Sequence, residues 1–96
     1  MRNLVILFFG IIISFELYTQ TIISGKVTDK NTGELLIGAT VIYGKGKGTA
    51  TDLEGNYSFR IQEGERTIKV SYVGYNEITK AVNVKGESQK LDFKLK

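Results

Sequence analysis

Few side chains in this 96-residue sequence could do chemistry, because it contains no histidine and no cysteine. Without an imidazole or a thiolate it lacks the usual ligands for zinc, copper and haem, and it has no cysteine nucleophile. The acids Asp29, Glu34, Asp52 and Glu54 all stand in segments typical of turns, where carboxylates are ordinary. A hydrolase requires a carboxyl group whose pKa is raised by an apolar environment, and none of these four acids stands in an apolar stretch. We therefore expect no catalytic residue, no cofactor and no enzymatic activity.

Asp52 and Glu54 could share a calcium ion, because carboxylates two positions apart can bind one cation. The segment lacks the third oxygen-bearing position and the distal glutamate of an EF-hand loop. The alternative is a tight turn in which Asp52 accepts backbone N–H groups and Gly55 adopts positive φ. We favour the turn and expect no metal site.

Glycine and lysine alternate over residues 44–48, a pattern that suggests a phosphate-binding loop. Such loops present their amides at the start of a helix, whereas a strand is expected after residue 48. We interpret the segment as a flexible loop between strands. The triplet Asn56-Tyr57-Ser58 matches a glycosylation acceptor, but Tyr57 and Phe59 must alternate into a core there, so we regard the match as incidental.

Three tyrosines, Tyr43, Tyr72 and Tyr75, could form an aromatic platform for a sugar or a peptide. Tyr72 follows the inward register of Ile68 and Val70, which favours packing in a core. Tyr75 comes just after Gly74 and is expected to be more open. Tyr75 and Tyr43 are therefore the candidate residues for surface binding.

The elements that position these side chains show period-two alternation of apolar and polar residues from Thr21 onward. Alternation gives each strand one buried face, so two sheets must pack together to close a core. Glycine, asparagine and aspartate interrupt the pattern every 8–12 residues. The sequence predicts an all-β fold, a seven-stranded antiparallel Greek-key β-sandwich of the immunoglobulin-like type. The predicted strands cover 23–27, 39–43, 49–51, 57–61, 68–72, 78–84 and 91–95.

The first twenty residues differ from the rest of the chain. Arg2 precedes the nearly unbroken apolar run Leu4–Phe15, and polarity returns before Gln20. Twelve apolar residues span about 18 Å as a helix, short of the ~30 Å of a bilayer core. We interpret residues 1–20 as a signal peptide cleaved near Gln20, and residues 21–96 as the domain. An uncleaved anchor is the alternative; after cleavage no transmembrane segment is expected.

The charge of the chain is mildly basic, with 13 Lys and Arg against 10 Asp and Glu. Residues 1–20 contain one arginine and one glutamate, so their removal leaves the net charge at +3. The lysines are spread singly along alternating segments, which is typical of solvated strand faces. No basic stripe interleaved with aromatic residues is present, so we expect no nucleic-acid binding.

Four motifs in order give the sequence a specific resemblance. They are ISGKVTD at 23–29, GELLIGATV at 33–41, GTATDLEGNYSF at 48–59 and VSYVGY at 70–75. Together they closely resemble the carboxypeptidase-regulatory-like domain, a transthyretin-like β-sandwich that is common behind the signal peptide of TonB-dependent outer-membrane receptors. The resemblance covers residues 22–95. One departure is Ile37, where the family often has proline.

The resemblance implies a non-catalytic, exported accessory or interaction module of the cell envelope, in the periplasm or at the outer membrane. A receptor continues into a plug and a barrel, and this sequence ends at Lys96, so only the module is carried over, encoded alone or as a truncated reading frame. The implied partner is an envelope protein, either an outer-membrane receptor or an energy-transducing protein. The alternatives are an independent carbohydrate- or peptide-binding module, and strand addition through an exposed edge.

Overall fold

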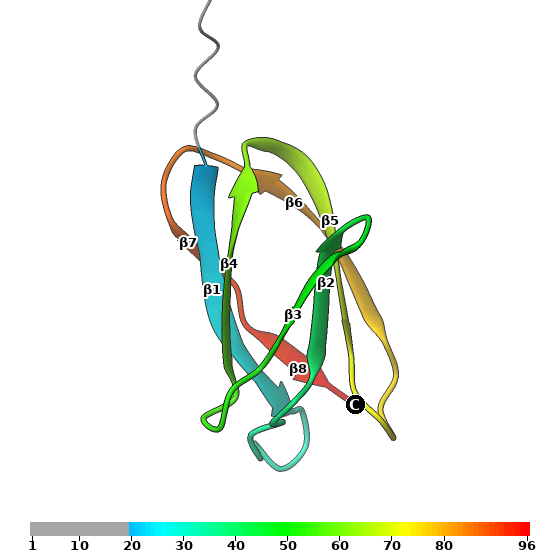
Figure 1. Cartoon of the computed structure of the whole chain (residues 1–96). Coiled ribbons are helices and arrows are strands. Elements are labelled where there is room, and N and C mark those ends of the chain that lie inside the picture. The colour runs from blue at the N-terminus through cyan, green and yellow to red at the C-terminus, as the bar shows by residue number, and fades with distance from the viewer. Residues whose placement is uncertain (1–19) are drawn as a thin grey trace, which may run out of the picture.

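Two four-stranded sheets pack face to face in the computed structural model, which describes residues 20–96 (Figure 1). The first sheet has the order β4-β1-β7, with β8 also paired to β1, and the second has the order β3-β2-β5-β6. The strands are β1 (Gln20–Asp29), β2 (Thr40–Gly44), β3 (Lys47–Ala50), β4 (Asn56–Gln62), β5 (Gly64–Ser71), β6 (Ile78–Val84), β7 (Gln89–Lys90) and β8 (Phe93–Leu95). The predicted all-β sandwich is confirmed.

Alternation along the strands determines which residues form the core. In β4, Tyr57, Phe59 and Ile61 are buried while Ser58 and Arg60 are exposed, as the period-two pattern predicts. The buried faces of both sheets meet in one apolar cluster, because each strand has only one apolar face. Its members are Ile23, Val27, Leu36, Ala39, Val41, Tyr57, Phe59, Ile61, Ile68, Val70, Val84, Phe93 and Leu95.

The C-terminal segment differs from the prediction of one antiparallel strand over 91–95. Two short strands, β7 and β8, run parallel to β1, so there are eight strands and the first sheet is mixed. The break lies at Leu91 and Asp92. Leu91 N–H donates to the Ser24 carbonyl at 2.7 Å, and Asp92 Oδ1 accepts the Lys26 N–H at 2.9 Å. The Asp92 side chain thus accepts the Lys26 N–H group in place of a backbone carbonyl, which interrupts the backbone hydrogen bonding between β1 and the C-terminal segment.

The glycine-lysine segment 44–48 also differs from its prediction as a flexible loop. It forms a tight hairpin, in which Gly44 ends β2, Lys47 begins β3 and only two residues turn the chain. Gly46 has a φ of 71° in that turn, a conformation that glycine adopts without the steric penalty of a side chain. Lys45 in the turn and Lys47 at the start of β3 are therefore held on a short, ordered hairpin.

Within residues 20–96, no helix has the length and apolar character needed to cross a membrane. The predicted signal peptide lies outside the described residues, apart from Gln20 at the start of β1.

Candidate functional site

The Asp52 segment is a turn, as interpreted from the sequence. Asp52 Oδ1 accepts the backbone N–H groups of Glu54 and Asn56, each at 2.9 Å, and Gly55 has a φ of 74°. These two hydrogen bonds to the ionised carboxylate hold the pKa of Asp52 below its usual value. No group of three or more acidic side chains that could hold a metal ion occurs in the described part of the chain.

Asp29 makes a similar turn at the end of β1. Its Oδ1 accepts the N–H groups of Asn31 at 2.7 Å and Thr32 at 2.9 Å, while Oδ2 accepts the hydroxyl of Tyr75 at 2.7 Å. The bond from Tyr75, followed by the backbone bond from Thr32, lowers the pKa of Asp29. The same bond raises the pKa of Tyr75 to about 12. Tyr75 is half-buried, and its hydroxyl group is already hydrogen-bonded to Asp29.

The three tyrosines do not form one platform. Tyr72 packs against Tyr75 with ring centroids 5.7 Å apart. This pair lies next to the start of β2, because Ser71, the residue before Tyr72, pairs with Thr40. Tyr43 lies near the other end of β2, where its ring stacks on Phe59 at 4.0 Å with an interplanar angle of 1°. The two candidate binding residues, Tyr43 and Tyr75, therefore belong to opposite ends of the sandwich.

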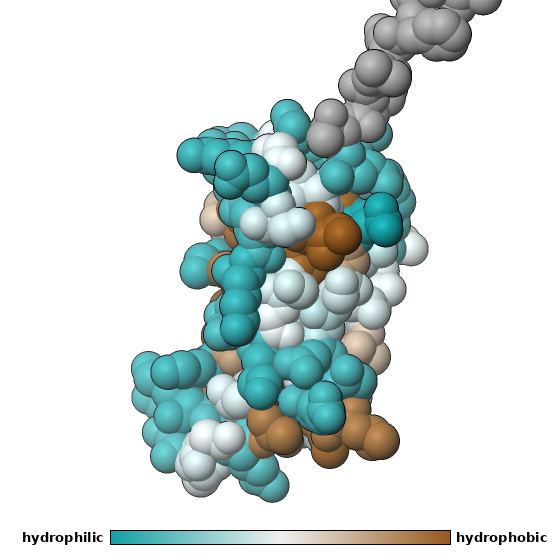
Figure 2. All heavy atoms as spheres, turned by 90° about the vertical axis from the view of Figure 1, so that its left-hand side faces the viewer, coloured by the Kyte–Doolittle hydropathy of each residue, from teal (hydrophilic) through white to brown (hydrophobic). Residues whose placement is uncertain are grey.

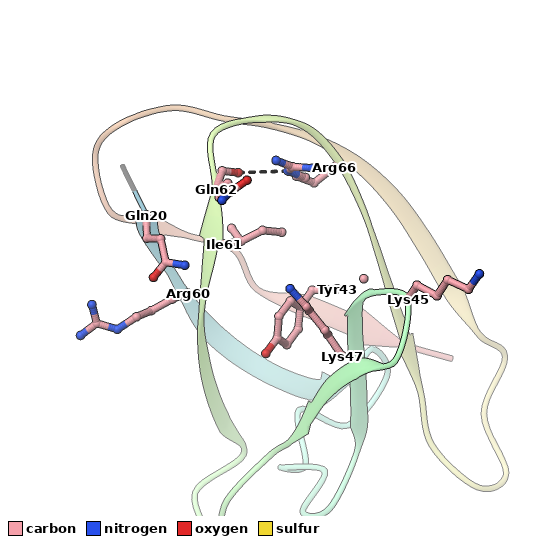
Figure 3. A pocket seen from close by; sticks show the side chains of 9 residues that line it. Gln20, Tyr43, Lys45, Lys47, Arg60, Ile61, Gln62 and Arg66 are labelled. Carbon is pink, nitrogen blue, oxygen red and sulfur yellow. Dashed lines mark hydrogen bonds between the residues drawn. The ribbon is translucent and has the colours of Figure 1, made fainter. Parts of the chain in front are cut away.

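A hollow lies beside Tyr43, between the β2–β3 hairpin and the C-terminal half of β4 (Figure 3). Strands β3 and β4 are each the edge strand of a different sheet, so the sandwich opens between them. The hollow, which we call the hairpin pocket, has a volume of about 350 Å³. It is lined by Gln20, Tyr43, Gly44, Lys45, Lys47, Arg60, Ile61, Gln62 and Arg66.

The side chains of the hairpin pocket come from three parts of the chain (Figure 3). Tyr43 and Ile61 give it apolar walls, and Lys47 lines it from the start of β3. Arg66 is fixed at one side, because Nε donates to the Gln62 carbonyl and Nη2 to the Glu63 carbonyl, both at 3.0 Å.

The charge of the hairpin pocket is entirely positive. Lys45, Lys47, Arg60 and Arg66 line it, and no acidic residue does. Within residues 20–96 the single salt bridge joins Lys69 to Glu77 at 3.8 Å, so none of the four pocket cations has a carboxylate within 4.0 Å. Sequence reasoning treated the two lysines as part of a loop and passed over both arginines. No local signal could have found this site, because it depends on how the two sheet edges diverge.

A second surface lies at the opposite end of the sandwich, where large apolar side chains are exposed. Leu53 is 80% exposed and Val73 is 91% exposed, and Leu35 and Ile37 are also exposed. Leu35 lies beside Gly55 in the Leu53 turn, where it faces the position that a Cβ would take. Val73 lines a hollow with Gly38, the residue after Ile37. Figure 2 shows exposed apolar side chains at the end away from the grey N-terminal atoms, in addition to an apolar patch in the half nearer to those atoms. We call Leu35, Ile37, Leu53 and Val73 the apolar end.

Comparison with known families agrees with the motif order and the fold. The family profile of the CarboxypepD_reg-like domain matches residues 23–96, which is nearly the whole described chain. The chain belongs to this family. As a CarboxypepD_reg-like domain, it is similar to the TonB-dependent receptor SusC of Bacteroides thetaiotaomicron, with 37% identity over 75 residues. That match covers 77% of this chain and 7% of SusC.

A viral protein is a second relative of this CarboxypepD_reg-like domain. Structural protein 27 of a virus (isolate Australia/Victoria) is 32% identical over 80 residues, covering 83% of this chain and 15% of the viral protein. The chain therefore spans only a small part of the length of both curated relatives.

Solved structures share the fold at low sequence identity. A DUF3823 family protein from Parabacteroides merdae matches with a TM-score of 0.62 and 14% identity, over 82% of this chain and 47% of that one. Chlorocatechol 1,2-dioxygenase from Pseudomonas putida matches with a TM-score of 0.66 and 17% identity, over 86% of this chain and 62% of that one. At these identities the matches show the β-sandwich fold of the domain and nothing of its activity.

Proposed function

We propose that this CarboxypepD_reg-like domain is an exported, non-catalytic accessory module of the cell envelope that acts by binding a protein partner. The observation that carries the proposal is the 37% identity to a region of a TonB-dependent receptor over 77% of the chain. The partner in this proposal is an outer-membrane receptor or an energy-transducing protein.

The state of the acids supports a binding role over catalysis. Asp29 and Asp52 accept backbone N–H bonds in turns, and both have lowered pKa values. A general acid at neutral pH needs the opposite change, a pKa raised by an apolar environment. Both carboxylates are thus suited to stabilising turns rather than to transferring protons.

The apolar end supports a protein as the partner. Exposed apolar groups that gather on one surface, rather than scattering singly, are typical of interaction sites. Leu53 and Val73 sit at the tips of the turns that follow β3 and β5 and are far more exposed than the core. A partner that covered them would remove apolar area from water and gain affinity from it.

Cell fractionation combined with cross-linking tests this proposal. The chain would be expressed in its native cells with a C-terminal tag and a photo-crosslinking amino acid in place of Leu53. We expect mass spectrometry to find a chain that begins within a few residues of Gln20 in the envelope fraction, cross-linked to an outer-membrane or energy-transducing protein. The same photo-crosslinker in place of exposed Lys80, on β6, is the control and should give no such product.

Two outcomes would overturn the proposal. One is recovery of the uncleaved chain in the cytoplasm alone. The other is a chain that is found in the envelope but gives the same cross-links from positions 53 and 80, or none from either. That result would contradict the binding of a protein partner.

A further inference from the structure

The hairpin pocket concentrates positive charge that the domain itself does not neutralise. Lys45, Lys47, Arg60 and Arg66 line one hollow, and no described carboxylate lies within 4.0 Å of any of them. The charged ends of Lys45 and Arg60 extend away from the hollow, which leaves Lys47 and Arg66 as the cations nearest to a bound group (Figure 3). Like charges repel one another, so the grouping of these cations does not by itself stabilise the fold. It does provide a site for an anionic group.

Arg66 is preoriented for a carboxylate. Its Nε and Nη2 are held by the carbonyls of Gln62 and Glu63, and Nη1 has no hydrogen-bond partner among the described residues. The guanidinium is therefore already fixed beside the pocket, so a ligand need not order it. Charge-assisted bonds from such a group to a carboxylate are short and directional.

Tyr43 forms a rigid apolar wall next to these donors. Its ring stacks on Phe59 with centroids 4.0 Å apart, and Phe59 belongs to the core. A ligand that carries both an acidic group and an aliphatic or aromatic stem can place the stem on this ring and the charge near Lys47 and Arg66.

The strands beside the pocket can accept an extended chain. β4 pairs with β1 on one side only, and β3 pairs with β2 on one side only. Each therefore presents an edge to which a peptide can add by main-chain hydrogen bonds. β4 offers seven residues, Asn56–Gln62, and ends at the pocket.

A membrane surface fits this site poorly. Proteins that lie on anionic lipid combine basic residues with adjacent apolar side chains that enter the bilayer. Here the two most exposed apolar residues, Leu53 and Val73, lie in turns at the opposite end of the sandwich, while Ile42, which precedes Tyr43 on β2, is 36% exposed. The cations instead line a hollow of about 350 Å³, a size suited to one or two side chains.

We propose that the hairpin pocket binds an acidic, extended segment of a partner protein, with its carboxylates on Lys47 and Arg66. This inference rests on the proposed role as an interaction module and specifies one chemical class of partner. The apolar end is a separate surface, so the two can be tested independently.

Binding of a synthetic acidic peptide to the purified protein tests the inference. The probe is a fluorescein-labelled peptide with four glutamates between serines, and its control has glutamine at those four positions. Fluorescence anisotropy is measured for the natural protein and for K47Q/R66Q. The matched control is K80Q/K94Q, which removes the same charge at exposed positions on β6 and β8.

We expect the acidic peptide to bind the natural protein and K80Q/K94Q within about twofold of each other. K47Q/R66Q should bind it about tenfold more weakly, as loss of charge-assisted bonds predicts. Lys47, Lys80 and Lys94 are exposed, whereas Arg66 is half-buried and donates hydrogen bonds to two backbone carbonyls. Thermal unfolding is therefore measured for all three proteins, and K47Q/R66Q should remain folded at the temperature of the binding assay.

Three results would overturn the inference: equal weakening in the two double variants, equal binding of the acidic and glutamine peptides, or binding of inorganic phosphate or phosphatidylglycerol vesicles in preference to the peptide. None depends on export or on the cross-link from Leu53. Failure of the pocket can therefore be distinguished from failure of the proposed function.

Discussion

The hydroxyl of Tyr75 donates a hydrogen bond to Oδ2 of Asp29 across 2.7 Å, joining residues 46 positions apart. Asp29 ends β1 in the first sheet, and Tyr75 lies in the turn between β5 and β6 of the second. The bond therefore ties the two sheets together at one end of the sandwich. The same Asp29 carboxylate also holds the turn that follows β1.

Replacing Tyr75 by phenylalanine should raise the pKa of Asp29 toward its ordinary value of 3.8, because the largest cause of its lowered pKa is removed. A lowered pKa contributes stability above the unfolded-state value, and that contribution is lost as the pH falls through the folded-state value. Y75F should therefore be less stable at neutral pH and lose less stability on acidification. Carboxyl NMR titration and denaturation at neutral and acidic pH measure the two effects.

Tyr72→Phe is the control for this prediction. Tyr72 lies in the same aromatic pair, but its hydroxyl makes no hydrogen bond within residues 20–96. The pKa of Asp29 should stay low in Y72F. An equal rise in both variants would show that the aromatic packing, rather than the hydroxyl, sets the acidity of Asp29.

Local patterns in the sequence were enough to predict most of the strands and the Asp52 turn, but not this bond. Alternation at Tyr57, Phe59 and Ile61 predicts a half-buried strand because side chains alternate in direction on any strand. The Asp52 turn was predictable because an aspartate side chain can accept backbone N–H groups of the residues that follow it, and a nearby glycine can adopt positive φ. The contact between Asp29 and Tyr75 depends on how two distant ends meet, which no local pattern encodes.

The hairpin pocket was missed for the same reason. Lys47 and Arg66 belong to strands that are not neighbours in the sheet, and the sequence shows them only as isolated cations. The break at Leu91 was hidden as well, because Leu91, Phe93 and Leu95 keep the alternation of a single strand. A hydrogen bond from the β1 backbone to the Asp92 side chain overrides that pattern.

Phe59→Ala should destabilise the domain by about 3–5 kcal/mol, as expected when a buried aromatic ring leaves a cavity. Phe59 is 6% exposed and its ring lies between those of Tyr43 and Tyr57. Arg60→Ala, one position along the same strand, is the control and should change stability by less than about 0.5 kcal/mol. Urea unfolding measures both, and equal effects would contradict the register of β4.

Gly55→Val should destabilise the domain for two separate reasons. Gly55 has a φ of 74°, which a β-branched residue rarely adopts, and an added Cβ would lie 3.2 Å from the Val27 carbonyl oxygen. Gly74→Val is the matched variant, because Gly74 has a φ of 90° but open space around its Cβ position. Urea unfolding should show a larger loss for G55V than for G74V. Equal losses would mean that the backbone conformation alone matters at Gly55.

Gly25 allows the C-terminal segment to approach β1 more closely than any side chain would permit. A Cβ at this position would lie 1.9 Å from the Leu91 carbonyl oxygen and 3.0 Å from the Tyr57 hydroxyl. The same hydroxyl donates its hydrogen bond to the Leu91 carbonyl, and burial raises the pKa of Tyr57. The absence of a side chain at Gly25 thus leaves room for the hydrogen bond from Tyr57, on β4, to Leu91, in the segment between β7 and β8 that lies against β1.

Gly25→Ala should therefore displace Leu91, break its bond to Tyr57 and destabilise the domain by about 2–4 kcal/mol, from overpacking and one lost buried hydrogen bond. Gly44→Ala is the control, since its Cβ would make an ordinary contact at 3.5 Å. Spectroscopic titration gives a second readout, because an exposed Tyr57 would return toward its usual pKa of 10.0. A G25A protein with unchanged stability and an unchanged Tyr57 pKa would show that the Leu91 segment does not depend on this approach.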